Sequence, residues 1–332
     1  MAHELRNAND MVYVGETPWH GLGVPLSQAP TTDELLACPQ LNWQVVKDPI
    51  QNVRTGEVIE GEFSLNREDT GEHLATVTSS YVPVQNSTAI EFFRDIVDEG
   101  HASYETAGVL QGGKKMWVLA KMAQDPIEPI KGDPIMPYFL FSHGHDGESA
   151  VKITPTTIRV VCANTLGWAD KQTQDYQVRI IHKSGVNQAI ANVEKITAAA
   201  IKGLAETEEI LRAMAGQPID PESLENYFRK ALRLPYRDPE LLKADEEAFE
   251  QLMKVGARVM DDVRDSYEEE AFSLNPKHRG TLYHGFQAVT NYTTHKRGTT
   301  DKAQRLNQNW FGYGAQIRGR AMTEAIDLLV AA

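Results

Sequence analysis

Cysteine is scarce in this sequence of 332 residues, which contains only Cys38 and Cys162. The chain has no Cys-x-x-Cys pair, so a zinc site built on cysteines is excluded. Two thiols far apart in the sequence are typical of a reduced cytoplasmic protein without disulfides, and we expect both to be free.

Long apolar runs and nucleotide-binding motifs are also missing. No stretch approaches the roughly 18 apolar residues that a membrane helix needs, and the N-terminus lacks a basic segment followed by an apolar one. No GxxxxGK[ST] motif is present, which argues against an ATPase. The glycines of Trp19-His20-Gly21-Leu22-Gly23 do not match a dinucleotide fingerprint, so we expect this segment to dock on the protein through Trp19. We therefore expect a cytoplasmic protein with no membrane segment and no cofactor.

An excess of basic residues is absent as well, since the formal net charge is −13. This total by itself argues against a nucleic-acid-binding protein. The charges are unevenly distributed, however. Residues 1–100 carry 16 acids and 5 bases, whereas residues 271–332 carry 3 acids and 8 bases. An acidic total can therefore hide a local basic face.

The first half of the chain predicts strands and the second half predicts helices. Segments rich in Val, Ile and Thr alternate with polar turns up to about residue 160, and Gly112-Gly113 predicts a hairpin between strands 103–110 and 116–122. One helix, 87–99, is embedded among them. Helical periodicity then predicts helices at 187–215, 221–232, 239–272 and 280–296, with a helical tail from 301.

We therefore predict an α+β protein with a β-rich N-terminal half, an embedded helix and hairpin, and a helical C-terminal half. The expected domains are a β-rich core (1–185), an acidic helical region (186–272), and basic C-terminal helices (273–332) that pack back on the core. In the acidic helix, the predicted inner stripe is Leu241, Phe249, Leu252, Val255, Val259 and Val263.

Several short strings, spread over most of the chain, resemble the phage/plasmid-like family known as domain of unknown function 932. They are Trp19–Gly23, Tyr81–Asn86, His145-Asp146-Gly147, Arg159–Leu166, His182, Gln287–Tyr292 and His295. The resemblance implies a mobile element, and so the cytoplasm of a bacterial host. A weaker similarity, in the order strand–helix–hairpin, links the chain to phage single-strand annealing recombinases. This second similarity is an analogy of architecture alone.

A first candidate site comprises His143, His145, Asp146 and Glu148, which are metal-ligand residue types. The two histidines, at i and i+2, would point to the same side of a strand. The alternative is a tight turn in which Asp146 caps its own backbone, because Asp-Gly is a common turn dipeptide. We prefer the turn and predict no metal.

A second candidate site surrounds Arg159–Thr165. Arg159 could bind a phosphate, with Asn164 adding a donor. Cys162 could be a nucleophile with His182 or His145 as its base. The alternative is a structural segment in which Cys162 is a small buried residue, the usual role of a free cysteine.

The C-terminal basic stretch is a third candidate, because cations and aromatic rings alternate in it. Its bases are Lys277, Arg279, Lys296, Arg297, Lys302, Arg305, Arg318 and Arg320, and its aromatic residues are Tyr283, Phe286, Tyr292, Trp310, Phe311 and Tyr313. Such a mixture suits a groove for single-stranded nucleic acid. The alternative is that the bases neutralise the acidic helix and that the aromatic rings form the core.

Our first functional hypothesis is a binding protein without a chemical step, a single-stranded DNA annealing or recombination protein that acts as a homo-oligomer. The expected DNA contacts are Lys114, Lys115, Arg159, Asn164, Arg179, Lys183, Lys296 and Arg297 for phosphates, with Tyr283 and Tyr292 for stacking; Lys152 and Lys171 could extend the set. Two alternatives stay open. One is an enzyme acting on nucleotides or nucleic acid, with His145, Asp146, Cys162, Asn164 and His182 in one pocket. The other is a counter-defence or host-takeover protein with an acidic surface.

Overall fold

The structure, a computed structural model, describes residues 10–15, 23–159, 164–166, 178–190, 193–234, 246–298, 304 and 308–332. Its strands are β1 (Met11–Tyr13), β2 (Val24–Pro25), β3 (Val45–Gln51), β4 (Val58–Arg67), β5 (His73–Thr78), β6 (Ala102–Leu110), β7 (Lys115–Met122), β8 (Ile135–Gly144), β9 (Val151–Arg159), β10 (Asn164–Leu166) and β11 (Val178–Ile180). Its helices are α1 (Thr32–Leu36), α2 (Asn86–Glu91), α3 (Arg94–Asp98), α5 (Val186–Ile190), α6 (Val193–Gly216), α7 (Pro221–Leu232), α8 (Glu246–Ser273), α9 (Leu282–Asn291) and α11 (Tyr313–Ala331), and α9 continues as a π-helical turn over Tyr292–Lys296. The strands lie in the first half and the longer helices in the second, which confirms the α+β prediction.

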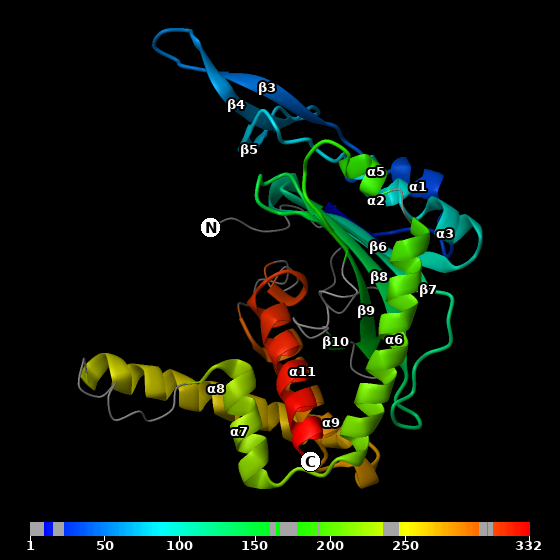
Figure 1. The fold of residues 1–332 in the computed structure, drawn as a ribbon, viewed down its shortest axis with the longest axis vertical. Coiled ribbons are helices and arrows are strands. Elements are labelled where there is room, and N and C mark those ends of the chain that lie inside the picture. The colour runs from blue at the N-terminus through cyan, green and yellow to red at the C-terminus, as the bar shows by residue number, and fades with distance from the viewer. Residues whose placement is uncertain are drawn as a thin grey trace.

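The main sheet has the strand order β10-β9-β8-β7-β6-β1-β2, and β11 pairs with β9 beside β10. Strands β6 to β9 form an antiparallel meander, whereas β1 and β2 are parallel. In β8, Met136 is the one described residue that is not buried. A strand buried on both sides needs both faces of its sheet covered, and Figure 1 shows helices and loops on both sides of it.

The hairpin between β6 and β7 turns at Gln111–Gly113, where the sequence predicted it. Gly113 has a φ of +103°, a backbone conformation that residues other than glycine rarely adopt. A Cβ at this position would lie 2.6 Å from Cζ2 of Trp43. The turn therefore requires glycine for two reasons, its backbone angle and its contact with the Trp43 ring.

One face of the main sheet is covered by α1, α2, α3, α5 and a second, three-stranded sheet of order β3-β4-β5. Figure 1 shows this small sheet at the end of the main sheet, next to α5 and α1. Its buried residues, such as Leu65 and Val77, join one core with Val118 and Phe141 of the main sheet. The small sheet is thus continuous with the main core rather than separate from it.

The prediction of a single helix over 87–99 was wrong about its continuity, because the structure divides this segment into α2 and α3. Phe92 and Phe93 lie at the break, and both are buried. Phe93 lies edge-on to Tyr104, and Phe92 contacts Phe141. Consecutive residues of one straight helix diverge by about 100°, so we attribute the break to the burial of both rings in the same core.

The helical half is built around α9, in which every residue is buried. The surrounding core takes side chains from α6, α7, α8 and α11, together with Ile135, the first residue of β8, and Ile130 in the segment before that strand. Helix α7 begins as predicted, with Asp220 as N-cap accepting from the backbone N–H groups of Glu222 and Ser223, and with Pro221 in its first turn. The proposed domain boundaries stay a prediction. This core includes residues from both predicted C-terminal regions.

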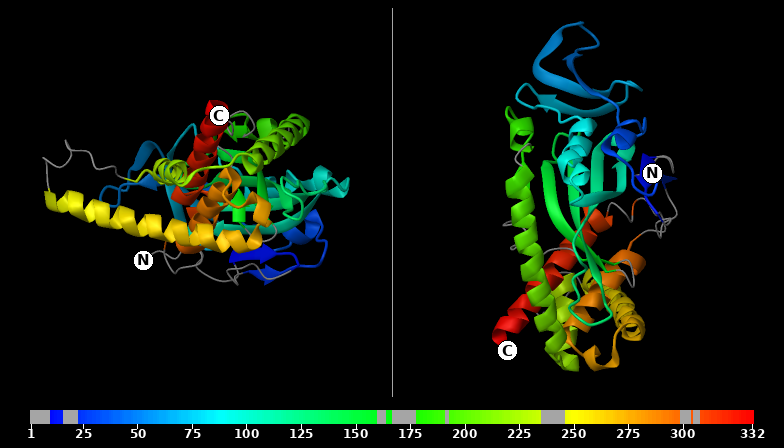
Figure 2. Two further views of the ribbon diagram at one scale, coloured as in Figure 1. Left: turned by 90° about the horizontal axis from the view of Figure 1, so that it is seen from below. Right: turned by 90° about the vertical axis from the view of Figure 1, so that its right-hand side faces the viewer.

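Helix α8 corrects part of the predicted inner stripe. Val263 is fully buried, but Leu252 and Val255 are 51% and 60% exposed. In Figures 1 and 2 the N-terminal part of α8 extends away from the other helices. The buried side of the helix includes Gly256 and Met260, which directly follow the predicted Val255 and Val259, so helical periodicity placed the inner face only in part. Leu241 and the side chain of Phe249 lie outside the described residues. Among the described helices, none is long and apolar enough to cross a membrane.

Candidate functional site

Strand β8 separates two groups of polar side chains. Ser142 and His143 are consecutive residues of β8, so their side chains point to opposite faces of the main sheet. Ser142 faces a pocket near Trp310 and Phe311, which pack on the second face of the sheet. His143 faces the other side, where two more histidines lie close to it.

A row of four side chains crosses the second face from β7 to β11. The directly paired residues are Trp117 with Ser142, Ser142 with Lys152, and Lys152 with Arg179. Directly paired residues of antiparallel strands place their side chains on the same face. Lys115 is two residues before Trp117 on β7 and therefore lies on this face too. The sheet thus gathers cations from three strands on one side.

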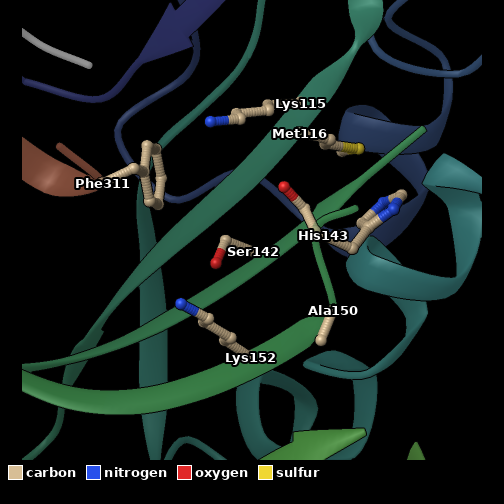
Figure 3. A pocket seen from close by; sticks show the side chains of 8 residues that line it. Lys115, Met116, Ser142, His143, Ala150, Lys152 and Phe311 are labelled. Atoms are coloured by element: carbon tan, nitrogen blue, oxygen red, sulfur yellow. The ribbon is translucent and has the colours of Figure 1, made fainter. Parts of the chain in front are cut away.

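These side chains form a basic pocket against the segment that precedes α11. The lining residues are Lys115, Met116, Ser142, His143, Ser149, Ala150, Lys152 and Phe311, around about 400 Å³ of space that includes the open mouth. Figure 3 shows Lys115, Ser142 and Lys152 on the side of Phe311, with the side chains of Met116 and His143 on the opposite side of the sheet. Ammonium and hydroxyl groups donate hydrogen bonds to a phosphate, and a phenyl ring can stack on a base. The pocket is therefore suited to a nucleotide unit.

Next to the pocket, Asp146 closes a tight turn after β8. Its carboxylate accepts from the backbone N–H groups of Glu148 (3.0 Å) and Ser149 (2.7 Å) and from the Ser149 hydroxyl (2.6 Å). Burial opposes ionisation of Asp146, but these hydrogen bonds and the charge of Lys115 outweigh it and lower the pKa. The turn interpretation preferred from the sequence therefore describes Asp146, and its negative charge offsets part of the charge of Lys115.

On the other face, His143, His145 and His182 form the histidine cluster. The ring of His143 lies 4.8 Å from that of His145 and 6.4 Å from that of His182, between centroids. All three side chains are buried, with at most 6% of their surface exposed. Tyr81 stacks on His182, with ring planes 6° apart, and Trp43 packs beside His145. The cluster lies where the small sheet meets the main sheet.

Burial dominates the electrostatics of this cluster. It lowers the pKa of His145 to about 3 and the pKa of His143 well below its usual range. Burial also lowers the pKa of His182, although the Val82 carbonyl and the charge of Asp146 partly oppose the shift. All three imidazoles are therefore neutral at pH 7.

The first candidate site, His143, His145, Asp146 and Glu148, was considered for a metal, but Asp146 is engaged in the turn that we preferred. The expectation that His143 and His145 would point to the same side is met by their 4.8 Å ring separation. Among the described residues, no three His, Cys, Asp or Glu side chains are grouped so that they could hold a metal ion. His182, which joins these two histidines, comes from a distant segment.

The pocket of the enzyme hypothesis assembles only in part. His145 and His182 lie in the histidine cluster, with Asp146 at its edge, whereas Cys162 lies outside the described residues. Asn164 of β10 lies directly opposite Arg159 at the end of β9. Arg159 is seven residues along β9 from Lys152, which lies at the end of the sheet that carries the histidine cluster. Strands rise about 3.4 Å per residue, so Asn164 lies about 24 Å from the histidine cluster, and its assignment to this pocket was wrong.

The predicted phosphate contacts divide between the two ends of the sheet. Arg179 and Lys183 are exposed and Lys115 lines the pocket, with Lys114 half-buried beside it. Arg159, by contrast, is at the far end of β9, about 24 Å along the strand from the pocket. A contact made by Arg159 would therefore belong to a different part of a bound chain.

The C-terminal candidates are largely structural. Tyr283 is fully buried and donates its hydroxyl to Asp133 (2.9 Å), and Tyr292 is 4% exposed. Rings without an accessible face do not stack on a base, so these two predictions were wrong. Lys296 pairs with Glu269 of the acidic helix α8 at 3.0 Å, which is the neutralising role considered as the alternative. Arg297 lies over the ring of Tyr313.

Sequence reasoning missed several residues of the pocket. Ser142 and Ser149 carry no pattern that would distinguish them from other surface or core residues, whereas Phe311 was already among the aromatic residues interleaved with the C-terminal bases. Lys152 was considered only as an extension of the basic set. Its alternation with Val151 and Ile153, which are both buried, was the available signal that it faces away from the core.

Fold and site together define an α+β protein with a basic pocket on one sheet face and a buried histidine cluster on the other. A family model described as a domain of unknown function (DUF932) matches residues 73–310, and the chain belongs to this family. The matched region includes every strand from β5 to β11, and therefore both sites apart from Phe311 and Trp43. Neither a curated protein nor a solved structure matches the chain.

Proposed function

We propose that this protein binds single-stranded DNA through the basic pocket, as a binding protein without a chemical step. The observation that carries the proposal is the cross-strand row in which Lys152 and Arg179 are directly paired, with Ser142 and Lys115 beside them. Such a row of cations attracts the phosphates of a DNA strand, and Phe311 provides an aromatic ring at its edge on which a base can stack.

The net charge of −13 does not exclude this role, because the charge is unevenly distributed: residues 101–205, which contain the pocket apart from Phe311, carry 9 acids and 11 bases. Glu225 binds Arg264 and Arg229, and Glu269 binds Lys296, all in the helical half. Acidic surfaces away from the pocket repel a polyanion and thereby favour its placement on the basic face.

Fluorescence anisotropy of a labelled single-stranded oligonucleotide tests the proposal. We expect saturable binding at about 50 mM KCl that weakens strongly at about 200 mM KCl, because bound phosphates release counterions. Absence of binding at the lower salt concentration would overturn the proposal. Tight binding to a host DNA-processing protein instead would favour the counter-defence alternative.

Matched lysine variants locate the binding site. Lys115→Ala combined with Lys152→Ala removes two pocket cations, and we expect the slope of log affinity against log salt to fall by about 2. Lys254→Ala is the control, because Lys254 is 78% exposed on α8 and pairs only weakly with Glu250, at 3.8 Å. Equal effects of the pocket and control substitutions would show that the binding is not centred on the pocket.

We propose further that binding serves single-strand annealing by a homo-oligomer of a mobile element. The support is the order strand, helices, hairpin over β5, α2, α3, β6 and β7, which is similar to the annealing recombinases. Light scattering with and without oligonucleotide measures the mass, and a fluorescence-quenching assay with complementary strands measures annealing. A monomer that binds DNA without accelerating annealing would retain the binding role and remove the annealing role.

A further inference from the structure

The basic pocket is closed at the end where β8 turns. Gly144, the last residue of β8, lies directly opposite Lys115 and shares a face of the sheet with Ser142. A Cβ on Gly144 would therefore point to the pocket side, and it would lie only 2.5 Å from the Cβ of Ser149. Ser149 thus packs over the end of β8 and lines the pocket there. A bound chain that follows β8 in this direction meets the turn.

Buried apolar side chains close two further sides of the pocket. Leu110 of β6 lies directly opposite Lys115. Leu140 precedes Ser142 by two residues on β8. Directly paired residues, and residues two apart in one strand, place their side chains on the same face of a sheet. Leu110 and Leu140 expose 0% and 7% of their surface and pack with Trp117 in one apolar cluster. The row of cations therefore stops at Lys115.

The remaining side of the pocket leads outward over Lys152 and Arg179. Arg179 lies directly opposite Lys152 and is exposed. Among the described strands, β11 pairs with β9 alone, so Arg179 carries the positive charge to the margin of the sheet. A polyanion is attracted along such a path. A path with one entrance and a closed end fits the end of a strand better than its middle.

The polar groups of the pocket suit a phosphate monoester. Figure 3 shows the amino groups of Lys115 and Lys152 and the hydroxyl of Ser142 on the side of the Phe311 ring. A terminal phosphate carries a charge of about −1.5 to −2 at pH 7 and three acceptor oxygens, whereas each phosphate inside a strand carries a single negative charge. Two ammonium groups and a hydroxyl therefore interact more strongly with the terminal group.

Two carboxylates of the turn reduce this attraction without reversing it. Asp146 already accepts three hydrogen bonds within the turn, and Glu148 is exposed. The cations that oppose these two acids are Lys115, Lys152 and Arg179. The charge around the pocket therefore stays positive.

We propose that the pocket binds the phosphorylated 5′ end of a DNA strand, with the terminal phosphate between Lys115 and Lys152 and the terminal base against Phe311. The strand then leaves the pocket over Arg179. The space of about 400 Å³, which includes the mouth, suits a single nucleotide unit, since small-molecule pockets begin at about 300 Å³. This inference rests on the proposed function and adds which part of the DNA occupies the pocket. The 5′ end is chosen because it ordinarily carries the terminal phosphate of a DNA strand, whereas the 3′ end carries a hydroxyl.

Fluorescence anisotropy with three oligonucleotides of one sequence tests the proposal. One carries a 5′-phosphate, one a 5′-hydroxyl, and one a 3′-phosphate with a 5′-hydroxyl, and each is labelled on an internal base. At about 150 mM KCl we expect the 5′-phosphate to bind about 10-fold tighter than the other two, the gain expected from one charge-assisted hydrogen bond.

The outcomes separate this inference from the proposed function. Equal affinities for the 5′-phosphate and the 5′-hydroxyl would overturn the recognition of the end, whereas salt-sensitive binding of both would retain the binding of DNA. Equally tight binding of the 3′-phosphate would overturn the assignment to the 5′ end. Absence of binding by all three oligonucleotides would overturn both proposals.

Competition with deoxyadenosine 5′-monophosphate distinguishes a strand end from a free nucleotide of the same chemistry. We expect this mononucleotide to displace the phosphorylated strand only at concentrations about 100-fold above the Kd of the strand, because it lacks the phosphates that lie over Arg179. Displacement at concentrations near that Kd would identify a free nucleotide as the ligand and would overturn the proposal.

Two variants locate the terminal phosphate. Lys115→Ala removes a cation at the closed end, and we expect the preference for the 5′-phosphate to fall below about 2-fold. Arg179→Ala is the matched control, because it removes a cation at the open side and should weaken all three oligonucleotides about equally. Loss of the preference in both variants, or in neither, would overturn the placement. Should Lys115→Ala not fold, as judged by circular dichroism, Lys115→Gln gives the same comparison with a longer neutral side chain.

Discussion

The indole rings of Trp117 and Trp310 lie stacked, with centroids 6.4 Å apart and planes 8° from parallel. Trp117 belongs to β7, in the middle of the main sheet, and Trp310 precedes α11 near the end of the chain. This contact attaches the C-terminal segment to the second face of the sheet and places Phe311 at the basic pocket.

We expect Trp310→Ala to lower the free energy of unfolding by about 2 kcal/mol, since a half-buried aromatic ring and its stacking partner are lost. Urea unfolding followed by circular dichroism measures the change. Val330→Ala is the control, because Val330 is 83% exposed on α11. A Trp310→Ala protein as stable as the native one would mean that this contact does not hold the segment on the sheet.

Gly113→Ala should destabilise the fold far more than Gly56→Ala. Both glycines have positive φ, +103° and +73°, but a Cβ at Gly113 would collide with Trp43, whereas a Cβ at Gly56 meets nothing within 4 Å. Backbone strain alone costs on the order of 1–3 kcal/mol, and the collision adds to it only at Gly113. Thermal and urea unfolding of the two variants compare the costs, and similar losses would contradict the role assigned to the ring contact.

Tyr283→Phe tests whether this residue belongs to the core. The change removes the hydroxyl that donates to Asp133, a carboxylate that is only 3% exposed. Loss of a buried donor to a charged group costs about 1–3 kcal/mol, and we expect a loss of that size in urea unfolding. Tyr313→Phe, at a position 36% exposed, should change stability by less than about 0.5 kcal/mol. A Tyr283→Phe variant as stable as the native protein would show that this hydrogen bond contributes little to the free energy of unfolding.

Two valines of α8 test which side of this helix is packed. Val263→Ala removes methyl groups from a fully buried site, and we expect a loss of about 2 kcal/mol. Val255→Ala, at a site 60% exposed, should alter the free energy of unfolding by less than about 0.5 kcal/mol. Circular dichroism during urea unfolding gives both values. A large effect at Val255 would indicate that a second chain covers this part of α8.

Several elements could be predicted because their signals are local. Asp220 and Pro221 begin α7 through the hydrogen bond of a cap and the fixed φ of proline, and neither depends on distant residues. The hairpin at Gly112 and Gly113 follows in the same way from positive φ. By contrast, the division of 87–99 into two helices depends on Phe92 and Phe93 meeting one shared core, which periodicity does not encode.

The sequence by itself determined the α+β order, the absence of a cysteine-based zinc site and the alternation that turns Lys152 away from the core. The tertiary structure alone decided three features. Lys152 lies directly opposite Arg179 on neighbouring strands, His182 lies beside His143, and Tyr283 is buried. The physical reason is range. Backbone preferences and side-chain alternation act over a few residues, whereas strand register and burial depend on which distant segments pack together.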